Sequence, residues 1–103
     1  MEKLIQETLA SALIELIIKI SQIEKVKKIA YNIEENTITV WIYADISISE
    51  NNTTRKIADI EYDFLRKHKE LLIDLNIIPL KDLNNKNIII PKDFQIISLS
   101  EEV

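Results

Sequence analysis

The side chains best suited to chemistry in this sequence are predicted to lie on one face of a β-sheet. In residues 37–49 apolar and polar side chains alternate almost without interruption, which indicates a strand with one buried and one polar face. Neighbouring strands of the same sheet add polar side chains to that second face. The resulting candidate ligand-binding or interface face consists of Lys28, Thr39, Trp41, Tyr43, Asp45, Asp74 and Asn76.

Three kinds of function are open to this face. The carboxylates of Asp45 and Asp74 beside the amide of Asn76 could coordinate a hard cation, or act as an acid/base pair in a small enzyme or ligand-binding domain. Trp41 and Tyr43 could stack the bases of single-stranded RNA, although the nearby carboxylates repel phosphate. The favoured alternative is burial of the aromatic side chains against a partner subunit or against the C-terminal residues.

No catalytic residue, cofactor or metal-ligand set is predicted from the remaining residues. His68 is the only histidine and cysteine is absent, so the usual nitrogen and sulfur ligands of zinc are lacking. His68 follows Phe64 by four residues and is expected at the border of an apolar helix face. A further group of acidic residues alternates with basic ones and predicts an ordinary solvent-exposed helix surface: Asp59, Glu61 and Asp63.

The composition excludes several classes of protein. A chain of 103 residues predicts one domain, with a core in residues 1–80 and a C-terminal extension in residues 81–103. The net charge of -4 argues against nucleic-acid binding, and the absence of glycine excludes Walker and Rossmann phosphate-binding loops. Neither a secretory signal nor an apolar run of about 20 residues is present, so the protein is expected to be soluble and cytoplasmic, without a membrane span.

Apolar periodicity predicts a helix, two strands, a second helix and a third strand. The helices are expected at residues 2–21 and 53–69, and the strands at residues 26–33, 37–49 and 71–78. This order predicts an α+β fold of the ferredoxin-like type, in which both helices cover one face of a three- or four-stranded sheet. Residues 88–91 and 94–99 are expected to form one or two short strands, as an added edge strand and a tail across a partner.

The hairpin and the second helix allow finer predictions. Ile33 is expected opposite Ile38 and Ala30 opposite Trp41, with Asn36 as the left-handed residue of the turn. Residues 49–52 offer capping side chains for the second helix. The side chains of this helix expected to face inward are Ile57, Ile60, Phe64 and Leu65, with Ala58 and Tyr62 beside them.

The first helix carries more apolar surface than one small sheet can cover. Its polar stripe is narrow and includes Glu15 and Lys19, which are spaced for an ion pair. We expect the excess to contact a second copy of the chain, with cover by the C-terminal residues as the alternative. The expected interface residues are Leu9, Ala12, Ile14 and Ile18, and the expected partner state is a homo-oligomer, with a dimer favoured.

Residues 37–80 resemble the cytoplasmic C-terminal domain of cation diffusion facilitator transporters. The resemblance lies in residues 38–45 (ITVWIYAD), residues 55–61 (RKIADIE) and residues 72–79 (LIDLNIIP). It implies the same order of elements and a dimer. It implies no metal site, because Arg55, Lys56 and Asn76 stand where the family places histidines, and Ile78 stands in place of an acidic residue before proline. The expected function, based on the excess apolar surface of the first helix, is a non-enzymatic, homo-oligomeric interaction or regulatory module.

Overall fold

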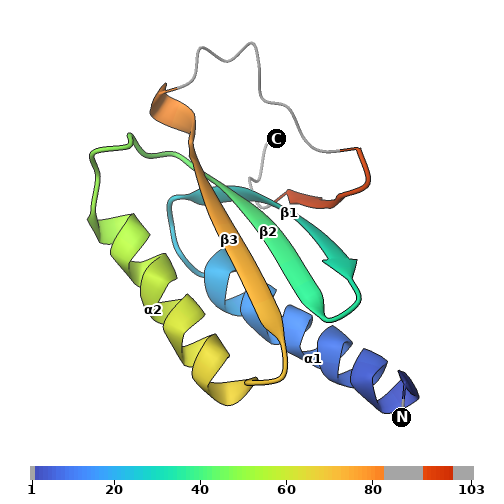
Figure 1. Ribbon diagram of the computed structural model, residues 1–103. Helices are drawn as coiled ribbons and strands as arrows, with labels where there is room; N and C mark the ends of the chain where they lie inside the picture. Colours follow the sequence, from blue (N-terminus) through green and yellow to red (C-terminus); the bar gives the residue numbers. More distant parts are fainter. Residues whose placement is uncertain (1, 83–91, 99–103) are drawn as a thin grey trace.

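The computed structural model describes residues 2–82 and 92–98 and has an α+β fold (Figure 1). It combines two helices with a four-stranded mixed sheet, in the predicted order of helix, strand, strand, helix and strand. The elements are α1 (Glu2–Ser21), β1 (Val26–Glu34), β2 (Thr37–Ala44), α2 (Asn52–Lys67), β3 (Leu72–Pro79), the short 3-10 helix η1 (Leu80–Asp82) and β4 (Gln95–Ser98).

The strands of the sheet follow the order β3-β2-β1-β4. β1 and β2 form an antiparallel hairpin, β2 and β3 run parallel, and β4 lies antiparallel beside β1. The predicted hairpin register is confirmed, because Ile33 lies opposite Ile38 and Ala30 lies opposite Trp41. This register brings the apolar side chains of both strands to the same face, whereas a slip by one residue would separate them.

The prediction for the hairpin turn was wrong by one residue. Glu35, and not Asn36, adopts the positive φ, at 56°. Asn36 instead joins the turn to the start of β3. Its side-chain amide donates to the backbone oxygen of Glu70 at 3.2 Å, and its own backbone oxygen accepts a hydrogen bond from the Leu72 N–H at 3.0 Å.

β2 is shorter than the predicted strand, because it ends at Ala44. The Ile46 N–H donates back to the Ala44 oxygen at 2.8 Å, which turns the chain out of the strand. Ile46 is buried but Ile48 is exposed, so apolar and polar residues still alternate in the sequence after the strand has ended. The alternation therefore overestimated the length of the strand.

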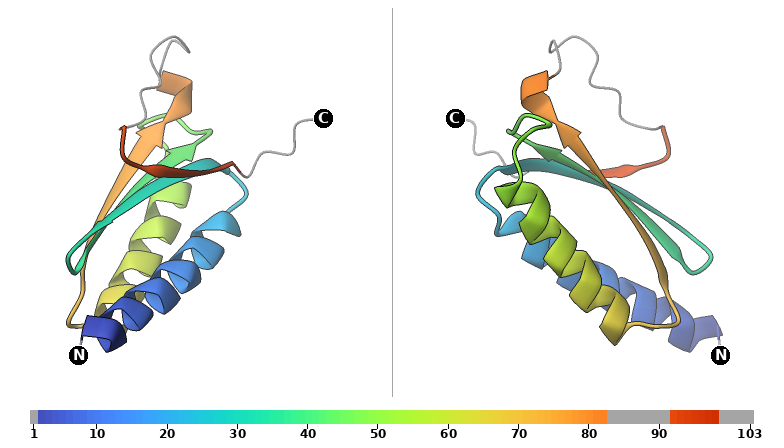
Figure 2. Two further views of the ribbon diagram at one scale, coloured as in Figure 1. Left: turned by 90° about the vertical axis from the view of Figure 1, so that its right-hand side faces the viewer. Right: turned by 60° about the vertical axis from the view of Figure 1, so that its left-hand side comes forward.

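Both helices pack against the same face of the sheet (Figure 2). The core between them contains large apolar side chains from every layer, each of which stabilises the fold by about 1.5–3 kcal/mol when fully buried. Its buried members include Leu9, Leu13, Leu16 and Ile20 of α1, Val26, Ile29, Ile38, Val40 and Ile42 of the hairpin, and Ile57 and Phe64 of α2. We call the opposite side of the sheet the open face.

α2 turns only part of its predicted apolar stripe toward this core. Ile57 and Phe64 are buried and Ile60 is partly buried, as expected. Leu65 and Tyr62 are exposed, so the prediction that Leu65 faces inward was wrong. These two side chains are consequently available to a partner.

The first turn of α2 is held by Glu50 rather than by an asparagine side chain. Asn51 precedes the helix but makes no side-chain capping hydrogen bond. The Glu50 carboxylate accepts a hydrogen bond from the Thr53 hydroxyl at 2.7 Å and lies 3.9 Å from the Lys25 ammonium. The hydrogen bond from Thr53 is the main cause that lowers the pKa of the Glu50 carboxyl, and the charge of Lys25 adds to it.

The C-terminal residues add a strand at one side of the sheet, as predicted for the run at residues 94–99. β4 pairs with β1, and Ile97 lies opposite Ile29 and packs against the core. The second predicted run, residues 88–91, lies outside the described residues. The addition of β4 means that β1 is paired on both sides, so β3 and β4 form the two edges of the sheet.

Candidate functional site

The open face brings together six of the seven residues predicted to share it. The strand register places Thr39 beside Asp74, Trp41 beside Asn76 and Tyr43 beside Lys28. These pairs form successive rows across β1, β2 and β3, on the side of the sheet away from the helices. The prediction of a shared face is confirmed for these residues.

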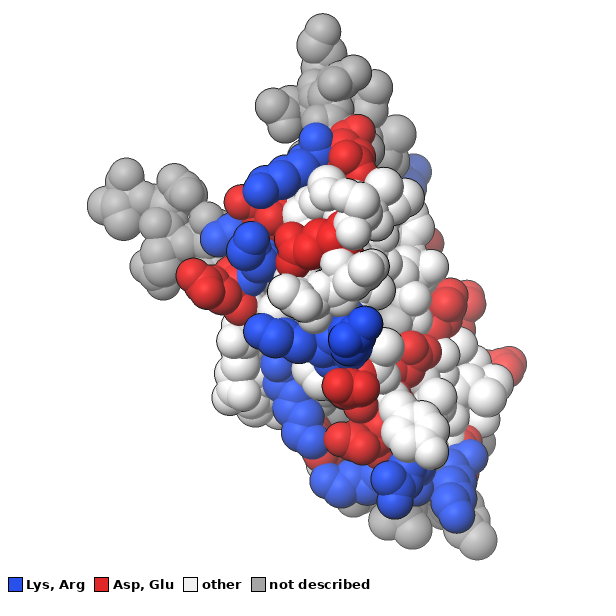
Figure 3. All heavy atoms as spheres, turned by 90° about the vertical axis from the view of Figure 1, so that its left-hand side faces the viewer, with Lys and Arg blue, Asp and Glu red and all other residues white. Residues whose placement is uncertain are grey.

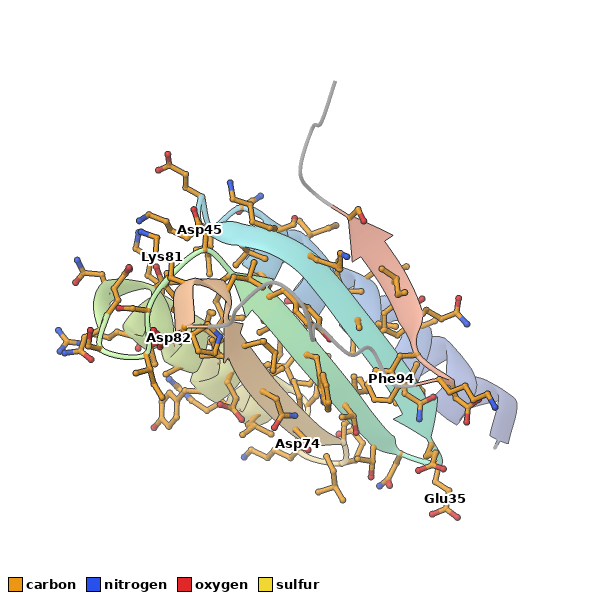
Figure 4. The ribbon with its side chains drawn as sticks, turned by 90° about the horizontal axis from the view of Figure 1, so that it is seen from above. Glu35, Asp45, Asp74, Lys81, Asp82 and Phe94 are labelled. Carbon is orange, nitrogen blue, oxygen red and sulfur yellow. The ribbon has the colours of Figure 1, made fainter. Side chains whose placement is uncertain are left out.

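Asp45 is the exception, and it lies far from Asp74, with which the alternative of a cation or acid/base site grouped it. Asp74 lies beside Thr39, whereas Asp45 follows β2 six positions later, which corresponds to about 20 Å along a strand. Figure 4 shows Asp45 near Lys81 and Asp82, toward the opposite end of the sheet from Asp74. Within the described residues no group of three or more His, Cys, Asp or Glu side chains could hold a metal ion. The arrangement does not support a cation site or an acid/base pair at Asp45 and Asp74.

The aromatic side chains of the open face are largely covered. Tyr43 is only 2% exposed, and this burial raises the pKa of its hydroxyl. Trp41 is partly buried, and its ring lies 5.9 Å from the ring of Phe94, at an interplanar angle of 60°. A base could not stack on Tyr43 or fully on Trp41 without displacing these contacts. The face thus resembles a small second core more than an open platform.

Phe94 is a residue of this face that sequence reasoning did not single out. It lies immediately before β4, which pairs with β1 in a fixed register from Gln95 to Ser98. A signal was present, because Phe94 is an aromatic residue at the start of a short apolar run. Its partner could not be identified without the position of β4, which depends on pairing across about 65 residues of sequence.

A second group of polar residues joins the two helices. The Glu15 carboxylate of α1 lies 2.7 Å from the Lys67 ammonium, 3.6 Å from the Lys19 ammonium and 3.5 Å from Nε2 of His68. The hydrogen bond from Lys67 is the main cause that lowers the pKa of Glu15. The expected pair of Glu15 and Lys19 is confirmed, but the contacts between the helices were not anticipated.

The cluster around Glu15 borders a groove of about 430 Å³ between α1 and α2. Three of its charged side chains, Glu15, Lys19 and Lys67, pair with one another at the contact between the helices. His68 packs on the Phe64 ring at a centroid distance of 4.7 Å, so it borders the apolar face as predicted. Basic and acidic side chains are interleaved on this side of the molecule (Figure 3). Such a surface does not select a strongly charged ligand.

The expected interface on α1 is only half available. Leu9 and Ala12 are buried in the core of the same chain, so a partner cannot reach them. Ile14 and Ile18 lie one helical turn apart and are 58% and 50% exposed. They form a small apolar strip on the outer surface of α1.

The edge formed by β3 offers backbone groups to a partner. The Leu72 N–H donates to the backbone oxygen of Asn36 and therefore points toward β2. Along a strand, the backbone N–H and C=O groups of successive residues point alternately to one side and to the other. The N–H and C=O groups of Ile73, Leu75 and Ile77 therefore point to the outer edge. Among the described residues no hydrogen bond to these backbone groups is formed.

Exposed apolar side chains lie on both sides of the β3 edge. Lys67 marks the flank of α2 that faces α1, and the helical angle of 100° per residue places Leu65 and Tyr62 on the other flank. That flank is on the β3 side, because α2 packs beside β3 and α1 beneath β1 (Figure 1). Tyr62 is 64% exposed, and Leu72 of β3 is also exposed. We call the outer edge of β3 together with Tyr62 and Leu65 the β3 edge surface.

Comparison of the chain with models of protein families, with curated proteins and with solved structures found no match. In the described residues, neither helix is long and apolar enough to cross a membrane.

Proposed function

We propose that this protein is a non-enzymatic interaction or regulatory module that acts as a homo-oligomer. Its framework would be a ferredoxin-like sandwich, related in the order of its elements to the cytoplasmic domains of cation diffusion facilitator transporters. The observation that carries the proposal is the β3 edge surface, where backbone groups with no hydrogen-bond partner among the described residues lie beside exposed apolar side chains. A sheet edge of this kind is ready to pair with another strand.

Self-association is favoured over binding of a small molecule by the distribution of exposed side chains. Two apolar surfaces are available, the strip of Ile14 and Ile18 and the β3 edge surface. Neither is an enclosed pocket with converging polar groups, which is the usual form of a site for a small ligand. Both are exposed apolar surfaces of the kind that proteins cover with another protein.

The proposal of a non-enzymatic role is supported by the failure of the candidate acid/base residues to meet. Asp45 and Asp74 lie at different ends of the sheet, and the Glu15 carboxylate is engaged by Lys67 and Lys19. General acid/base catalysis requires both groups within hydrogen-bonding reach of one substrate. The described residues offer no such arrangement around these carboxylates.

The test of this function is the mass of the protein in solution. Static light scattering of the full chain, measured across a dilution series from high to low micromolar concentration, should give a weight-average mass near twice 12.0 kDa that falls on dilution. A mass of 12.0 kDa at every concentration would rule out the proposed function. This measurement does not depend on which of the two surfaces forms the contact.

A further inference from the structure

The direction of the backbone groups in β3 limits how a second copy could pair with it. Only Ile73, Leu75 and Ile77 direct N–H and C=O groups outward, because the alternate residues direct theirs to β2. A strand added to this edge must therefore place its own outward residues opposite these three. For two identical strands that run antiparallel, this condition leaves few registers.

We propose that two copies of the chain pair through β3, antiparallel, with the two-fold axis at Leu75. This inference rests on the proposed self-association and names the surface and register that produce it. In this arrangement Leu75 lies opposite Leu75 of the second copy, and Ile73 lies opposite Ile77. Each of the three opposed pairs exchanges two backbone hydrogen bonds, and the two sheets become one continuous sheet.

Asp74 and Pro79 make the two neighbouring registers less favourable. An axis at Asp74 would place the two Asp74 carboxylates directly opposite each other, and like charges in that position destabilise a strand pair. An axis at Asn76 would place Ile73 opposite Pro79, which has no N–H to donate. The register centred on Leu75 avoids both problems and uses all of the outward N–H groups.

The same register gives the polar side chains of β3 complementary partners. Asp74 lies opposite Asn76 of the second copy, and this contact occurs twice because of the two-fold symmetry. The Asn76 amide can donate a hydrogen bond to the Asp74 carboxylate. These positions form the closer type of antiparallel pair, in which facing side chains lie nearest to each other. The open face thus supplies polar specificity at the contact.

Apolar side chains around the edge would be covered by the same contact. A two-fold axis perpendicular to the sheet keeps the helices of both copies on one side. The flanks of α2 that carry Tyr62 and Leu65 then face each other beneath the joined strands. On the open face, the exposed Leu72 lies opposite Ile78 of the second copy. The contact would therefore bury three of the exposed apolar side chains of the chain.

Disulfide cross-linking tests this register directly, because the chain contains no cysteine. Asp74→Cys and Asn76→Cys are prepared as separate full-length variants, mixed, and oxidised with oxidised glutathione. The two substituted residues lie opposite each other in the proposed register, where the Cα atoms are about 4.5 Å apart and a disulfide can form. Two copies of the same variant would place these positions diagonally, at about 7–8 Å, which is beyond the usual range.

We expect the mixture to give mainly the mixed disulfide, with each variant alone giving at least fivefold less cross-linked product. Efficient cross-linking of Asp74→Cys alone would move the axis to Asp74, and that of Asn76→Cys alone would move it to Asn76; either result overturns the register. Circular dichroism checks the fold of both variants, whose substituted side chains lie on the open face outside the core.

A control on α1 separates this inference from the proposed function. Ile18→Cys places the cysteine on the apolar strip of α1, away from β3. Cross-linking of Ile18→Cys without cross-linking at β3 would refute the β3 pairing and leave the homo-oligomer intact. If light scattering finds a monomer and no variant cross-links, both the inference and the proposed function fail. Self-pairing would also be refuted if the β3 variants cross-linked to another protein added to the mixture but not to each other.

Discussion

The two edge strands of the sheet, β4 and β3, differ in length and in the way they are protected. At one edge, β4 pairs with β1 over only four residues and is largely exposed on its outer side. At the other, β3 extends over eight residues, with a single charged side chain at Asp74 and no chain beside it among the described residues. Proteins usually protect a free edge by shortening it, by adding charge or by covering it.

The difference teaches which part of the surface is suited to a partner. The β4 edge is short and follows a segment in which Phe94 contacts Trp41, so the chain protects this side of the sheet itself. The β3 edge is long and almost uncharged, and it is flanked by Tyr62 and Leu65. An edge with these properties would favour aggregation unless a defined partner covered it, which a second copy in a single register would do.

The largest predicted effect concerns the core that supports both edges. Phe64→Ala should reduce the free energy of unfolding by about 3–5 kcal/mol, because it removes a buried aromatic side chain and leaves a cavity beneath the sheet. Urea unfolding measured by circular dichroism checks this value. Tyr62→Ala, on the exposed flank of the same helix, is the matched control; in the monomer it removes only the exposed contact of the ring with Arg66 and should cost less than about 1 kcal/mol. Equal losses for both variants would contradict the assigned orientation of α2.

A smaller effect is expected at the β4 side, and it should leave the β3 side unchanged. Phe94→Ala should reduce the free energy of unfolding by about 1 kcal/mol, through loss of the aromatic contact with Trp41. Since Trp41 is the only tryptophan, its fluorescence emission should shift to longer wavelength as water gains access. Gln95→Ala serves as the control. An unchanged emission maximum for Phe94→Ala would show that this contact does not cover Trp41 in solution.

At the β3 edge, two substitutions of Asn76 are expected to change the dimer Kd by similar factors in opposite directions. Asn76→Lys would place a positive charge opposite Asp74 of the second copy and should lower the dimer Kd by about three- to tenfold, since two such contacts form. Asn76→Asp would create like-charge pairs and should raise the Kd by a similar factor. Sedimentation velocity measures both values. If both substitutions weaken the dimer equally, Asn76 lies opposite itself and the register is wrong.

The smallest predicted effect concerns the ion cluster between the helices, away from both edges. The pKa of Glu15 is lowered in the folded protein, mainly by Lys67, so its contribution to stability is present above its ordinary pKa of 4.5 and is lost as the pH falls through the lowered value. Glu15→Gln should cost about 0.5 kcal/mol at neutral pH, because the pair is partly solvated. The difference should disappear in strong acid. Urea unfolding at several pH values measures this difference, with Glu24→Gln as control. A stability difference between the protein and Glu15→Gln that persisted in strong acid would refute the prediction.

The sequence predicted the hairpin well because its pattern allows only one register. Ile33 and Ile38 must share a face, and shifting one strand by one residue would place the apolar side chains of the two strands on opposite faces of the sheet. The end of β2 could not be predicted in the same way, since Ile46 continues the alternation although it lies in a turn. The alternative of a paired Asp45 and Asp74 failed for another reason, because the register that places Asp74 beside Thr39 could not be derived from the sequence.

Contacts between distant segments were the part that the sequence could not supply. Glu15 and Lys67 belong to different helices, and no local spacing relates them. The pairing of Trp41 with Phe94 likewise depends on the position of β4. Leu9 and Ala12 were expected at an interface because their apolar character does not reveal whether the same chain covers them. Apolar spacing in one helix therefore did not distinguish the side chains that the same chain buries from those that stay exposed.

The measurement closest to the central claim is the amide hydrogen exchange of β3, followed residue by residue by NMR at two protein concentrations. The amides of Asp74 and Asn76 face β2 and should be protected at both concentrations. The amides of Ile73, Leu75 and Ile77 should be protected at high concentration and should lose at least tenfold of their protection on dilution, as the second copy dissociates. Rapid exchange of these three amides at every concentration would contradict pairing through β3.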